Sequence, residues 1–416
     1  MAKKVVVIGG GIIGLCSAYY LQKEGHQVTV IDKSSMDAGA SYVNAGYLTP
    51  SHIIPLASPG MISKGLKYMF NSASPFYMKP RLDYDFLKWA WAFKKSSTPK
   101  KVDKAMPLIR DINLLSRDLY DELKTDIAFK DFHYERKGLL MYFQTQKEGD
   151  HEIKVAESAK RLGLASSILD MEGISKVETG ISVNALGAVH YHCDGHTTPL
   201  NFMKLLKANL TKNGVKILKN EAVIDFKITK DKIKSIQTTT TNYHFDEVVL
   251  ATGSWSGNLA KKLKLDLRIQ AGKGYCIDEL NPTNITMPAI LLEAKMAVTP
   301  MIGFTRFAGT MEFSGINHQI NKKRVNAIAD GAKRFYNGLQ INRASSANAS
   351  CGLRPVSPDG LPYIGRVKHL NNLSIATGHA MMGWSLGPAT GKLIAELISD
   401  KVTSLNISSY SPLRTF

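Results

Sequence analysis

Glycines spaced for a nucleotide-binding turn open the chain. The segment GGGIIG at residues 9–14 follows the apolar run at residues 5–8 and precedes a stretch of helical character that ends near residue 25. A second apolar run, residues 28–31, ends at Asp32, eighteen residues after Gly14. This order of strand, glycine turn, helix, strand and acid is the context that a G-x-G-x-x-G dinucleotide-binding motif requires.

Each residue type in this motif has a physical task. Gly9 allows a tight turn, Gly11 lets backbone N–H groups approach a pyrophosphate, and Gly14 lets the helix pack closely on the strand. The helix N-terminus favours the phosphates, and Asp32 would accept hydrogen bonds from an adenosine ribose. The alternative is a glycine turn without a ligand. A secretory signal is disfavoured because glycines interrupt the apolar stretch.

The composition is that of an ordinary soluble globular protein. The chain has 416 residues, enough for two or three domains, 44% of them hydrophobic, and its mean hydropathy is −0.11. No run approaches the ~18 uninterrupted apolar residues of a transmembrane helix. The four cysteines (Cys16, Cys193, Cys276 and Cys351) show neither CxxC nor metal-ligand spacing, so we expect reduced thiols, no metal site and a cytoplasmic protein.

The net charge of +18 is the unusual feature of the composition. Nucleic acid is disfavoured as a partner, because the sequence carries no RNP, zinc-finger or recognition-helix signature. Residues 64–70 and 86–95 mix aromatic and apolar side chains with lysines. They suit a helix lying on an anionic membrane surface, peripherally on the inner face of the cytoplasmic membrane. Equally, the aromatics would pack in a core while the lysines, including Lys88, Lys94 and Lys95, face water.

Apolar periodicity predicts alternating helices and strands over most of the chain. We expect helices at about 12–25, 107–124, 147–162, 170–178, 200–213, 322–336 and 385–399, and strands at 5–8, 28–31, 132–143, 215–218, 222–228, 232–239, 244–250, 267–277, 289–292, 297–300, 304–313 and 373–379. The predicted nucleotide-binding domain is discontinuous, comprising residues 1–50, 190–264 and 345–416. Residues 51–189 and 265–344 are predicted to form a substrate-binding domain.

Later segments extend the opening motif. The strand at 247–250 runs into Ala251-Thr252-Gly253-Ser254. A strand that ends in this way is typical of a second backbone segment that approaches a bound dinucleotide. The other motifs are the loop at 41–46, KGY at 273–275, TRFAGTME at 305–312, GLRPVSPDGLP at 352–362, and TGH at 377–379 ending at Gly383-Trp384. Together they resemble the D-amino-acid oxidase-like superfamily of FAD enzymes over nearly the whole chain, and most closely the bacterial D-amino-acid dehydrogenases of the small-subunit type.

The resemblance implies an α/β fold with a Rossmann-like FAD-binding domain of the GR2 or D-amino-acid oxidase type. A discontinuous α+β substrate domain would be built on a mixed antiparallel sheet. The FAD is expected to be non-covalent, because the flavin-linking cysteine of related sarcosine oxidases aligns one residue away from Cys351. The expected cofactor contacts are Gly9, Gly11, Ile12, Ile13, Gly14, Asp32, Lys33, Ser41, Asn44, Ala45, Gly46, Val223, Ala251, Thr252, Gly253, Trp255, Gly352, Arg354, Gly378, His379, Gly383 and Trp384.

The family chemistry moves a hydride from the α-carbon of a D-amino acid to flavin N5, and the imino acid hydrolyses to a 2-oxo acid and ammonia. A bidentate arginine suits the α-carboxylate. We expect Arg306, in mid-strand, to be that anchor, and Arg354, in a Gly-Leu-Arg-Pro turn, to lie beside the flavin with the carboxylate as a second possible contact. A structural ion pair is the alternative for each. Tyr275 and His379 complete the expected catalytic set, and we expect the Tyr275 phenol to hydrogen-bond the carboxylate while its ring walls the pocket. His52 is a weaker candidate at the pocket entrance.

One departure from the superfamily leaves the substrate open. Glycine-oxidase-like members carry Pro-Arg where this chain has Pro300-Met301. Either the anchor moves to Arg306 or the substrate differs, so a cyclic or N-methyl amino acid (D-hydroxyproline, D-proline, sarcosine or glycine) stays an alternative. A flavin-bound scaffold subunit without turnover is a further alternative. We expect the electrons to pass to a membrane quinone or another acceptor rather than mainly to oxygen.

Overall fold

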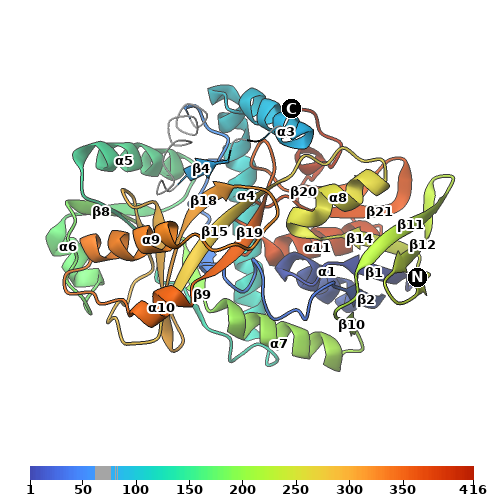
Figure 1. Cartoon of the computed structure of the whole chain (residues 1–416), viewed down its shortest axis with the longest axis horizontal. Helices are drawn as coiled ribbons and strands as arrows, with labels where there is room; N and C mark the ends of the chain where they lie inside the picture. The colour runs from blue at the N-terminus through green and yellow to red at the C-terminus, as the bar shows by residue number, and fades with distance from the viewer. Residues whose placement is uncertain (61–75, 80, 82) are drawn as a thin grey trace.

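The computed structural model describes the whole chain except residues 61–75, 80 and 82 (Figure 1). A largely parallel sheet has the strand order β10-β2-β1-β14-β21-β20. Its strands are β1 (Lys4–Ile8), β2 (Gln27–Ile31), β10 (Lys216–Leu218), β14 (Glu247–Leu250), β20 (Tyr363–Val367) and β21 (Leu370–Thr377). Segments from both ends of the chain and from its middle therefore meet in one sheet. The FAD-binding architecture predicted from the sequence is confirmed.

Alternation along β1 explains why both faces of this sheet are covered. Val5 and Val7 pack in a core with the helices α1 (Ile12–Lys23), α7 (Pro199–Lys212) and α11 (Gly387–Ile398). Val6 and Ile8 point the other way, into a core shared with α8 (Ser256–Lys262) and the small sheet of β11 (Val223–Thr229), β12 (Lys232–Thr238) and β13 (Asn242–Tyr243). Burying each such side chain stabilises the fold by about 1.5–3 kcal/mol.

A second, mixed sheet has the order β19-β15-β18-β17-β16-β6-β8-β7, with β4 beside β18. Its strands are β4 (Phe76–Met78), β6 (Leu139–Phe143), β7 (Ser166–Leu169), β8 (Gly187–Tyr191), β15 (Gln270–Glu279), β16 (Ala289–Leu291), β17 (Met296–Met301), β18 (Phe304–Phe313) and β19 (Ser350–Val356). Most neighbours are antiparallel, whereas β16 with β6 and β18 with β4 are parallel. This is the mixed sheet expected for the substrate side of the fold.

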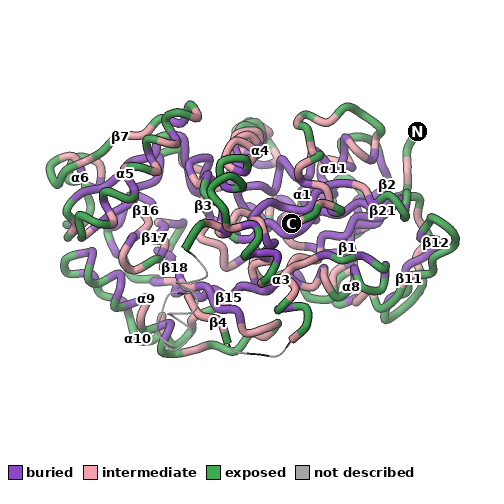
Figure 2. Tube along the Cα trace, turned by 90° about the horizontal axis from the view of Figure 1, so that it is seen from above, coloured by how far each residue is buried: buried purple, intermediate pink, exposed green. Residues whose placement is uncertain are grey.

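Helices cover the second sheet at the end of the molecule away from α1 and α11 (Figure 1). They are α5 (Gln146–Arg161), α6 (Met171–Val177), α9 (Lys322–Phe335) and α10 (Arg343–Ala347). Residues of α9 and α5 belong to separate apolar cores. Figure 2 shows buried segments running through both sheets.

Further elements join the two sheets. The helix α4 (Pro99–Thr125) contributes side chains to the core of the parallel sheet and to the core beneath α5. A separate antiparallel ladder has the order β3 (Tyr47–Leu48), β9 (Gly195–Thr197) and β5 (Tyr134–Glu135). The remaining elements are the helix α3 (Tyr84–Ser96) and the 3-10 turns η1 (Gly253–Trp255) and η2 (Ser408–Tyr410).

Three sequence predictions about elements need correction. The helix predicted from residue 107 begins at Pro99, because Thr98 caps it by accepting from the Lys101 N–H, and Pro107 lies inside the helix. The strand predicted over 244–250 begins only at Glu247, as β14, because residues 244–246 connect it to β13 of another sheet. Arg354 lies in the strand β19 rather than in a turn. The domain boundaries stay a prediction.

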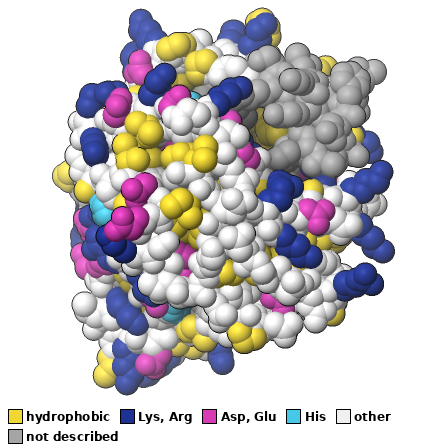
Figure 3. Space-filling view, turned by 90° about the vertical axis from the view of Figure 1, so that its left-hand side faces the viewer, with side chains coloured by type: hydrophobic (Ala, Val, Ile, Leu, Met, Phe, Trp, Pro, Cys, Tyr) yellow, Lys and Arg dark blue, Asp and Glu magenta, His cyan; other side chains and the backbone are white. Residues whose placement is uncertain are grey.

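The surface does not gather its positive charge on the face drawn in Figure 3. Lysine and arginine side chains are dispersed over it, with acidic side chains among them. In the described part of the chain, no helix is long and apolar enough to cross a membrane. The predicted lysine-aromatic segment at 64–70 lies outside the described residues.

Candidate active site

A single elongated cavity of about 890 Å³ connects the two sheets. One end is lined by the turn after β1, by residues that follow β2, and by the turn after β14. The other end is lined by residues of the second sheet, among them Tyr275, Ala308 and Arg354. Ligands bind at the carboxyl ends of strands in open α/β sheets, and the cavity follows this rule.

The glycine turn is shaped by close backbone contacts. Gly9 has φ +111°, and a Cβ built on it would lie 2.4 Å from the carbonyl oxygen of Ala251. A Cβ on Gly14 would lie 1.8 Å from the carbonyl oxygen of Gly9, so this glycine packs α1 against the turn. Gly9 and Gly11 line the cavity, whereas Gly14 does not. The expected ligand contact at Gly14 is therefore corrected to a packing role.

Asp32 holds the same turn from the end of β2. One carboxylate oxygen accepts from the Gly10 N–H at 2.6 Å. The other accepts from the N–H of Ser34 at 2.8 Å and from its hydroxyl at 2.6 Å. A carboxylate has about four lone-pair sites, so Asp32, which also lines the cavity, keeps acceptor capacity for a ligand hydroxyl.

The neighbouring Lys33 closes this end of the cavity with Trp255. The ammonium lies 3.7 Å from the centroid of the indole ring, within cation–π range. The indole in turn stacks on His318 at 6.1 Å. Burial lowers the pKa of Lys33. Val223, the first residue of β11, also lines the cavity.

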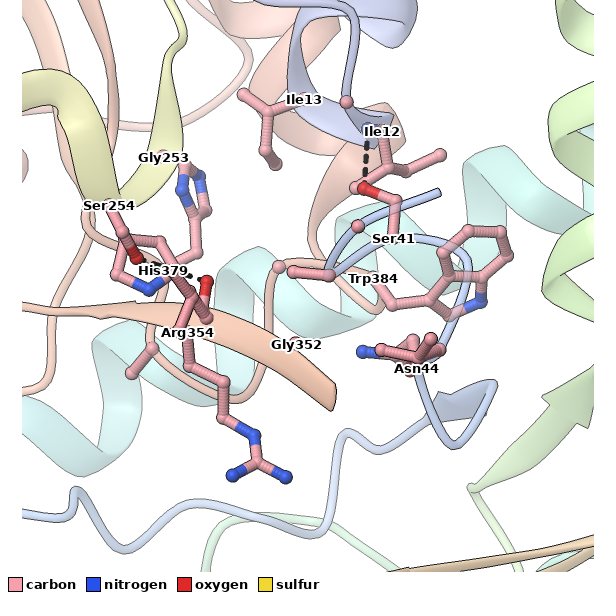
Figure 4. Close-up of a pocket in the computed structure, with 18 of the residues that line it drawn as sticks. Ile12, Ile13, Ser41, Asn44, Gly253, Ser254, Gly352, Arg354, His379 and Trp384 are labelled. Carbon is pink, nitrogen blue, oxygen red and sulfur yellow. Dashed lines mark hydrogen bonds between the residues drawn. The ribbon is translucent and has the colours of Figure 1, made fainter. Parts of the chain in front are cut away.

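The loop at 41–46 is fixed at both of its ends. The Ser41 hydroxyl oxygen accepts from the Ile12 N–H at 3.0 Å, as Figure 4 shows. The Asn44 side-chain oxygen accepts from the Gly46 N–H at 2.8 Å. The Gly46 carbonyl accepts from the backbone N–H and the hydroxyl of Thr197. Gly46 itself, with φ +76°, does not line the cavity, so its predicted contact is replaced by this anchoring role.

The turn after β21 brings His379 to the cavity wall. Its Nε2 lies 2.9 Å from the Thr390 hydroxyl, and its buried Nδ1 has no hydrogen-bond partner in the described chain. Burial lowers the pKa of His379 to about 3, so the ring is neutral. Gly378, with φ +79°, packs against Tyr363 and does not line the cavity, which corrects its predicted contact.

Arg354 extends from β19 into the cavity (Figure 4). One Nη donates to the Thr310 carbonyl at 2.7 Å. Among the residues that the structure describes, no carboxylate pairs with this guanidinium. Burial lowers its pKa to about 10, so it remains a cation at neutral pH. Gly274 leaves the room for it, since a Cβ there would lie 2.2 Å from the other Nη.

The structure contradicts the assignment of Arg306 as substrate anchor. Its guanidinium binds both oxygens of Asp278 at 2.7 Å and donates to the carbonyls of Tyr42 and Asn44 at 2.7 and 2.8 Å. The side chain is 2% exposed and does not line the cavity. Four of its five N–H donors are bonded to protein, so the alternative of a structural ion pair is the one observed.

The Tyr275 ring lines the cavity, but its hydroxyl points elsewhere. It donates to Glu312 at 2.7 Å, and Glu312 also lies 3.2 Å from Lys273 and from Arg324. A phenol has one proton to donate. Tyr275 therefore forms a wall of the cavity. The expected hydrogen bond from its hydroxyl to a substrate carboxylate is not supported, because that proton is donated to Glu312.

Most predicted contacts meet at this cavity. Those that line it are Gly9, Gly11, Ile12, Ile13, Asp32, Lys33, Ser41, Asn44, Ala45, Val223, Ala251, Thr252, Gly253, Trp255, Tyr275, Gly352, Arg354, His379, Gly383 and Trp384, together with His52. Sequence reasoning missed Met36, Tyr47, Thr49, Met141, Glu221, Ala222, Asn258, Ile290, Ala297 and Ala308. Glu221 and Ala222 were within reach, because they precede the predicted Val223; the apolar ones carry no local signal.

The donor set fits an extended FAD. The cavity runs without a break from Asp32 to Arg354, and backbone with small side chains lines its middle. A turn that a Cβ would fill lies at the phosphate end, and a buried, unpartnered His379 Nδ1 lies farther along. Cys351 does not line the cavity and its thiol contacts the His318 carbonyl, as non-covalent binding requires.

Replacing Gly9 by alanine is expected to remove the FAD. The new Cβ would collide with the backbone of Ala251, so the glycine turn and the turn after β14 must separate. Gly25→Ala is a matched control, because Gly25 also has positive φ but nothing within 4 Å of a Cβ. We expect a flavin-to-protein absorbance ratio near zero for Gly9→Ala and a wild-type ratio for Gly25→Ala. Equal ratios would contradict the role of this contact.

Comparison with known proteins places the chain among flavoenzymes. A family model described as FAD dependent oxidoreductase (DAO) matches residues 4–397. The D-amino acid dehydrogenase of Helicobacter pylori is 32% identical over 411 residues, covering 98% of this chain and 97% of the relative. The D-amino acid dehydrogenase of Vibrio atlanticus is 30% identical over 422 residues, covering 98% and 99%.

Solved structures agree in fold. Glycine oxidase from Geobacillus kaustophilus superposes with a TM-score of 0.79 at 21% identity, over 100% of this chain and 99% of the other. L-proline dehydrogenase from P. horikoshii gives a TM-score of 0.75 at 19% identity, over 99% and 97%. At these identities the likeness concerns the fold alone.

Proposed function

Because the chain belongs to the DAO family of FAD-dependent oxidoreductases, we propose that it oxidises D-amino acids to 2-oxo acids and ammonia. The names of its relatives from H. pylori and V. atlanticus support this substrate class. The observation that carries the proposal is a buried guanidinium facing the cavity without a carboxylate partner among the described residues, that of Arg354. A buried, unpaired cation is costly unless a ligand supplies the anion.

Arg354 is the anchor for the substrate α-carboxylate in this proposal. One Nη donates to the Thr310 carbonyl, and the Arg354 side chain lines the cavity. Two parallel N–H···O bonds to a carboxylate would fix the substrate in position and orientation. FAD, when bound, supplies the two-electron oxidant, and the protein binds and aligns the substrate.

Part of the lining at this end is apolar, and a lysine there, Lys295, pairs with Glu148 at 2.6 Å. Met141, Ile290, Ala297 and Ala308 are apolar lining residues. Burial lowers the pKa of His52 to about 4, so this lining side chain is neutral. An apolar surround strengthens the pairing of Arg354 with an incoming carboxylate. The cavity therefore suits an amino acid with an apolar side chain.

The proposal is tested by reducing the flavin of the holoenzyme without oxygen. Members of a panel of D-, L- and N-methyl amino acids, with glycine and D-proline, are mixed with the protein under argon, and flavin absorbance is followed. We expect fast bleaching by D-amino acids with apolar side chains and little by their L-enantiomers. Bleaching by sarcosine or glycine alone would replace the proposal with the N-methyl or glycine alternative, and bleaching by none would support the scaffold alternative.

The proposed electron acceptor is a quinone of the membrane rather than oxygen. The family resemblance suggests this acceptor, and the surface of α3 supports it. Tyr84, Leu87 and Trp91 are exposed at helical spacing, being 76%, 52% and 57% exposed. Lys94 and Lys95 lie 5.5 and 5.6 Å from the Trp91 ring. Aromatic side chains flanked by lysines suit the interface of an anionic bilayer.

Vesicle binding tests this peripheral membrane site. Lys88 is not substituted in this test, because its ammonium forms an ion pair with Asp266 at 2.9 Å. We expect the wild type to sediment with vesicles containing anionic lipid, and the Leu87→Gln/Trp91→Gln variant to remain in the supernatant. Lys94→Glu/Lys95→Glu should weaken binding in a salt-dependent way. The control is Ile168→Gln, which changes an exposed apolar residue on β7 instead of α3. Unchanged sedimentation of both double variants would refute the site.

A further inference from the structure

Two histidines and a glutamate meet on a short β-ladder outside the cavity. Glu135, on β5, pairs directly with His196, on β9. His133 stands two residues before Glu135, and residues at i and i+2 of an extended chain share a face. One ligand atom from each side chain lies within 4.8 Å of the other two.

His196 is the unusual member of this cluster. The residue is 0% exposed, and in the described chain neither ring nitrogen has a hydrogen-bond partner. Its Nε2 lies 3.8 Å from a Glu135 oxygen, too long for a hydrogen bond. The Pro300 carbonyl lies beside the ring without reaching hydrogen-bond geometry. Leaving a buried polar group unpaired costs about 1–3 kcal/mol. A ligand that pairs with the His196 ring would remove this cost.

The His133 ring is held by a hydrogen bond at one nitrogen, and its other nitrogen faces Glu135. Its Nδ1 lies 2.8 Å from the Thr198 hydroxyl, which also accepts from the Ile302 N–H at 3.0 Å. Its Nε2 lies 3.5 Å from a Glu135 oxygen. A hydrogen bond at one ring nitrogen that directs the other toward a ligand point is typical of metal-binding histidines.

We propose that His133, Glu135 and His196 bind a divalent cation of the zinc class. Two imidazoles and one carboxylate form a ligand set that Zn²⁺ takes, with the fourth position left to water. Bonds of about 2.0–2.1 Å in a tetrahedron put ligand atoms about 3.3 Å apart. One Glu135 oxygen lies 3.5 Å from His133, and the other, which Lys137 also contacts, lies 3.8 Å from His196. The three ligand atoms, now within 4.8 Å of one another, must therefore move closer together when the ion binds.

Lys137 is the competing cation. Its ammonium lies 2.7 Å from one Glu135 oxygen, and its side chain is 48% exposed. The other oxygen, which faces His133, remains available, and Lys137 is free to turn toward water when the metal arrives. The doubly charged ion replaces this exposed ion pair, which is itself worth little.

The site is linked to the flavin cavity through the residue next to His196. The Thr197 hydroxyl donates to the Gly46 carbonyl at 3.0 Å and accepts from the Trp384 indole N–H at 2.8 Å. A metal that joins β5 to β9 would therefore hold the 41–46 loop and Trp384 in place. This makes the ion a structural clamp rather than a participant in the oxidation.

Calorimetry with zinc alone tests the site. The holoenzyme is freed of metal with a chelator, dialysed and titrated with ZnCl₂. We expect one equivalent to bind and the melting temperature to rise with zinc concentration. Glu135→Gln and His133→Gln, both at partly exposed positions, should weaken the Kd by at least about 100-fold, since even outer-shell changes cost 10–100-fold. Co²⁺ should show tetrahedral visible absorption in the wild type and not in these variants.

Matched substitutions separate this site from adventitious binding. His151→Gln and Glu157→Gln alter exposed residues on α5 and should keep wild-type zinc affinity. Wild-type flavin content in every variant shows that the fold is intact. The absence of binding heat in the wild type, or zinc affinity that survives both Glu135→Gln and His133→Gln, would overturn the proposal.

Discussion

Arg354→Ala is expected to lower kcat/KM for D-amino acids by on the order of 100-fold or more while the flavin stays bound. The substitution deletes the cavity-facing guanidinium that lacks a carboxylate partner among the described residues. Truncating one member of a buried, hydrogen-bonded charge pair costs about 2–5 kcal/mol, and each 1.36 kcal/mol corresponds to tenfold. Steady-state kinetics on flavin-loaded protein provide the measurement.

The conservative variant sharpens this prediction. Arg354→Lys keeps the charge but cannot form two parallel bonds, so it should recover part of the lost affinity and not the full kcat/KM. A larger effect on KM than on kcat would indicate that the residue binds substrate and transition state alike. If Arg354→Ala leaves KM unchanged, the carboxylate is held elsewhere and the assignment is wrong.

Arg306→Met is expected to destabilise the protein by about 3 kcal/mol and to lower the melting temperature by roughly 3–4 °C. It removes four hydrogen bonds, two to Asp278 and two to the carbonyls of Tyr42 and Asn44. Asp278 is 35% exposed, so water compensates part of the loss and the lower end of the range for buried pairs applies. Thermal unfolding of the apoprotein measures the effect.

The same Arg306→Met variant also tests how the 41–46 loop contributes to FAD binding. The released 41–46 loop should bind FAD more weakly, yet molecules that keep their flavin should retain a KM within about twofold of wild type. The Arg306→Met/Asp278→Leu variant removes the stranded carboxylate and should regain part of the stability. A large rise in KM in flavin-loaded Arg306→Met would restore Arg306 as the anchor.

The FAD-binding half of the fold could be predicted because its signals are local. The glycine spacing at 9–14, the apolar run before it and the acid at Asp32 lie within one strand-helix-strand unit. The strands β1, β2 and β14 alternate between two covered faces, so continuous apolar runs identify them. Contacts such as Gly14 and Gly46 were predicted for the right loops but serve packing and anchoring instead.

The choice between the two arginines could not be predicted, because it depends on strand register. In the ladder of β15 and β18, Asp278 lies directly opposite Arg306, and the two side chains form a bidentate ion pair. The Gly-Leu-Arg-Pro segment was predicted as a turn, but it belongs to β19 at the edge of the second sheet, where a strand tolerates Pro355. Register of this kind is set by partners far away in the sequence.

The order in which the parallel sheet is completed has a consequence for synthesis of the protein. β1 and β2 leave the ribosome first, but their neighbours β14 and β21 end at Leu250 and Thr377. At ~5–20 residues per second, this delay lasts on the order of tens of seconds. During that time the Val6 and Ile8 face of β1 has no cover and its edge has no partner. Because lining residues of the flavin cavity extend to Trp384, the cavity is complete only after this late part of the chain has been synthesised.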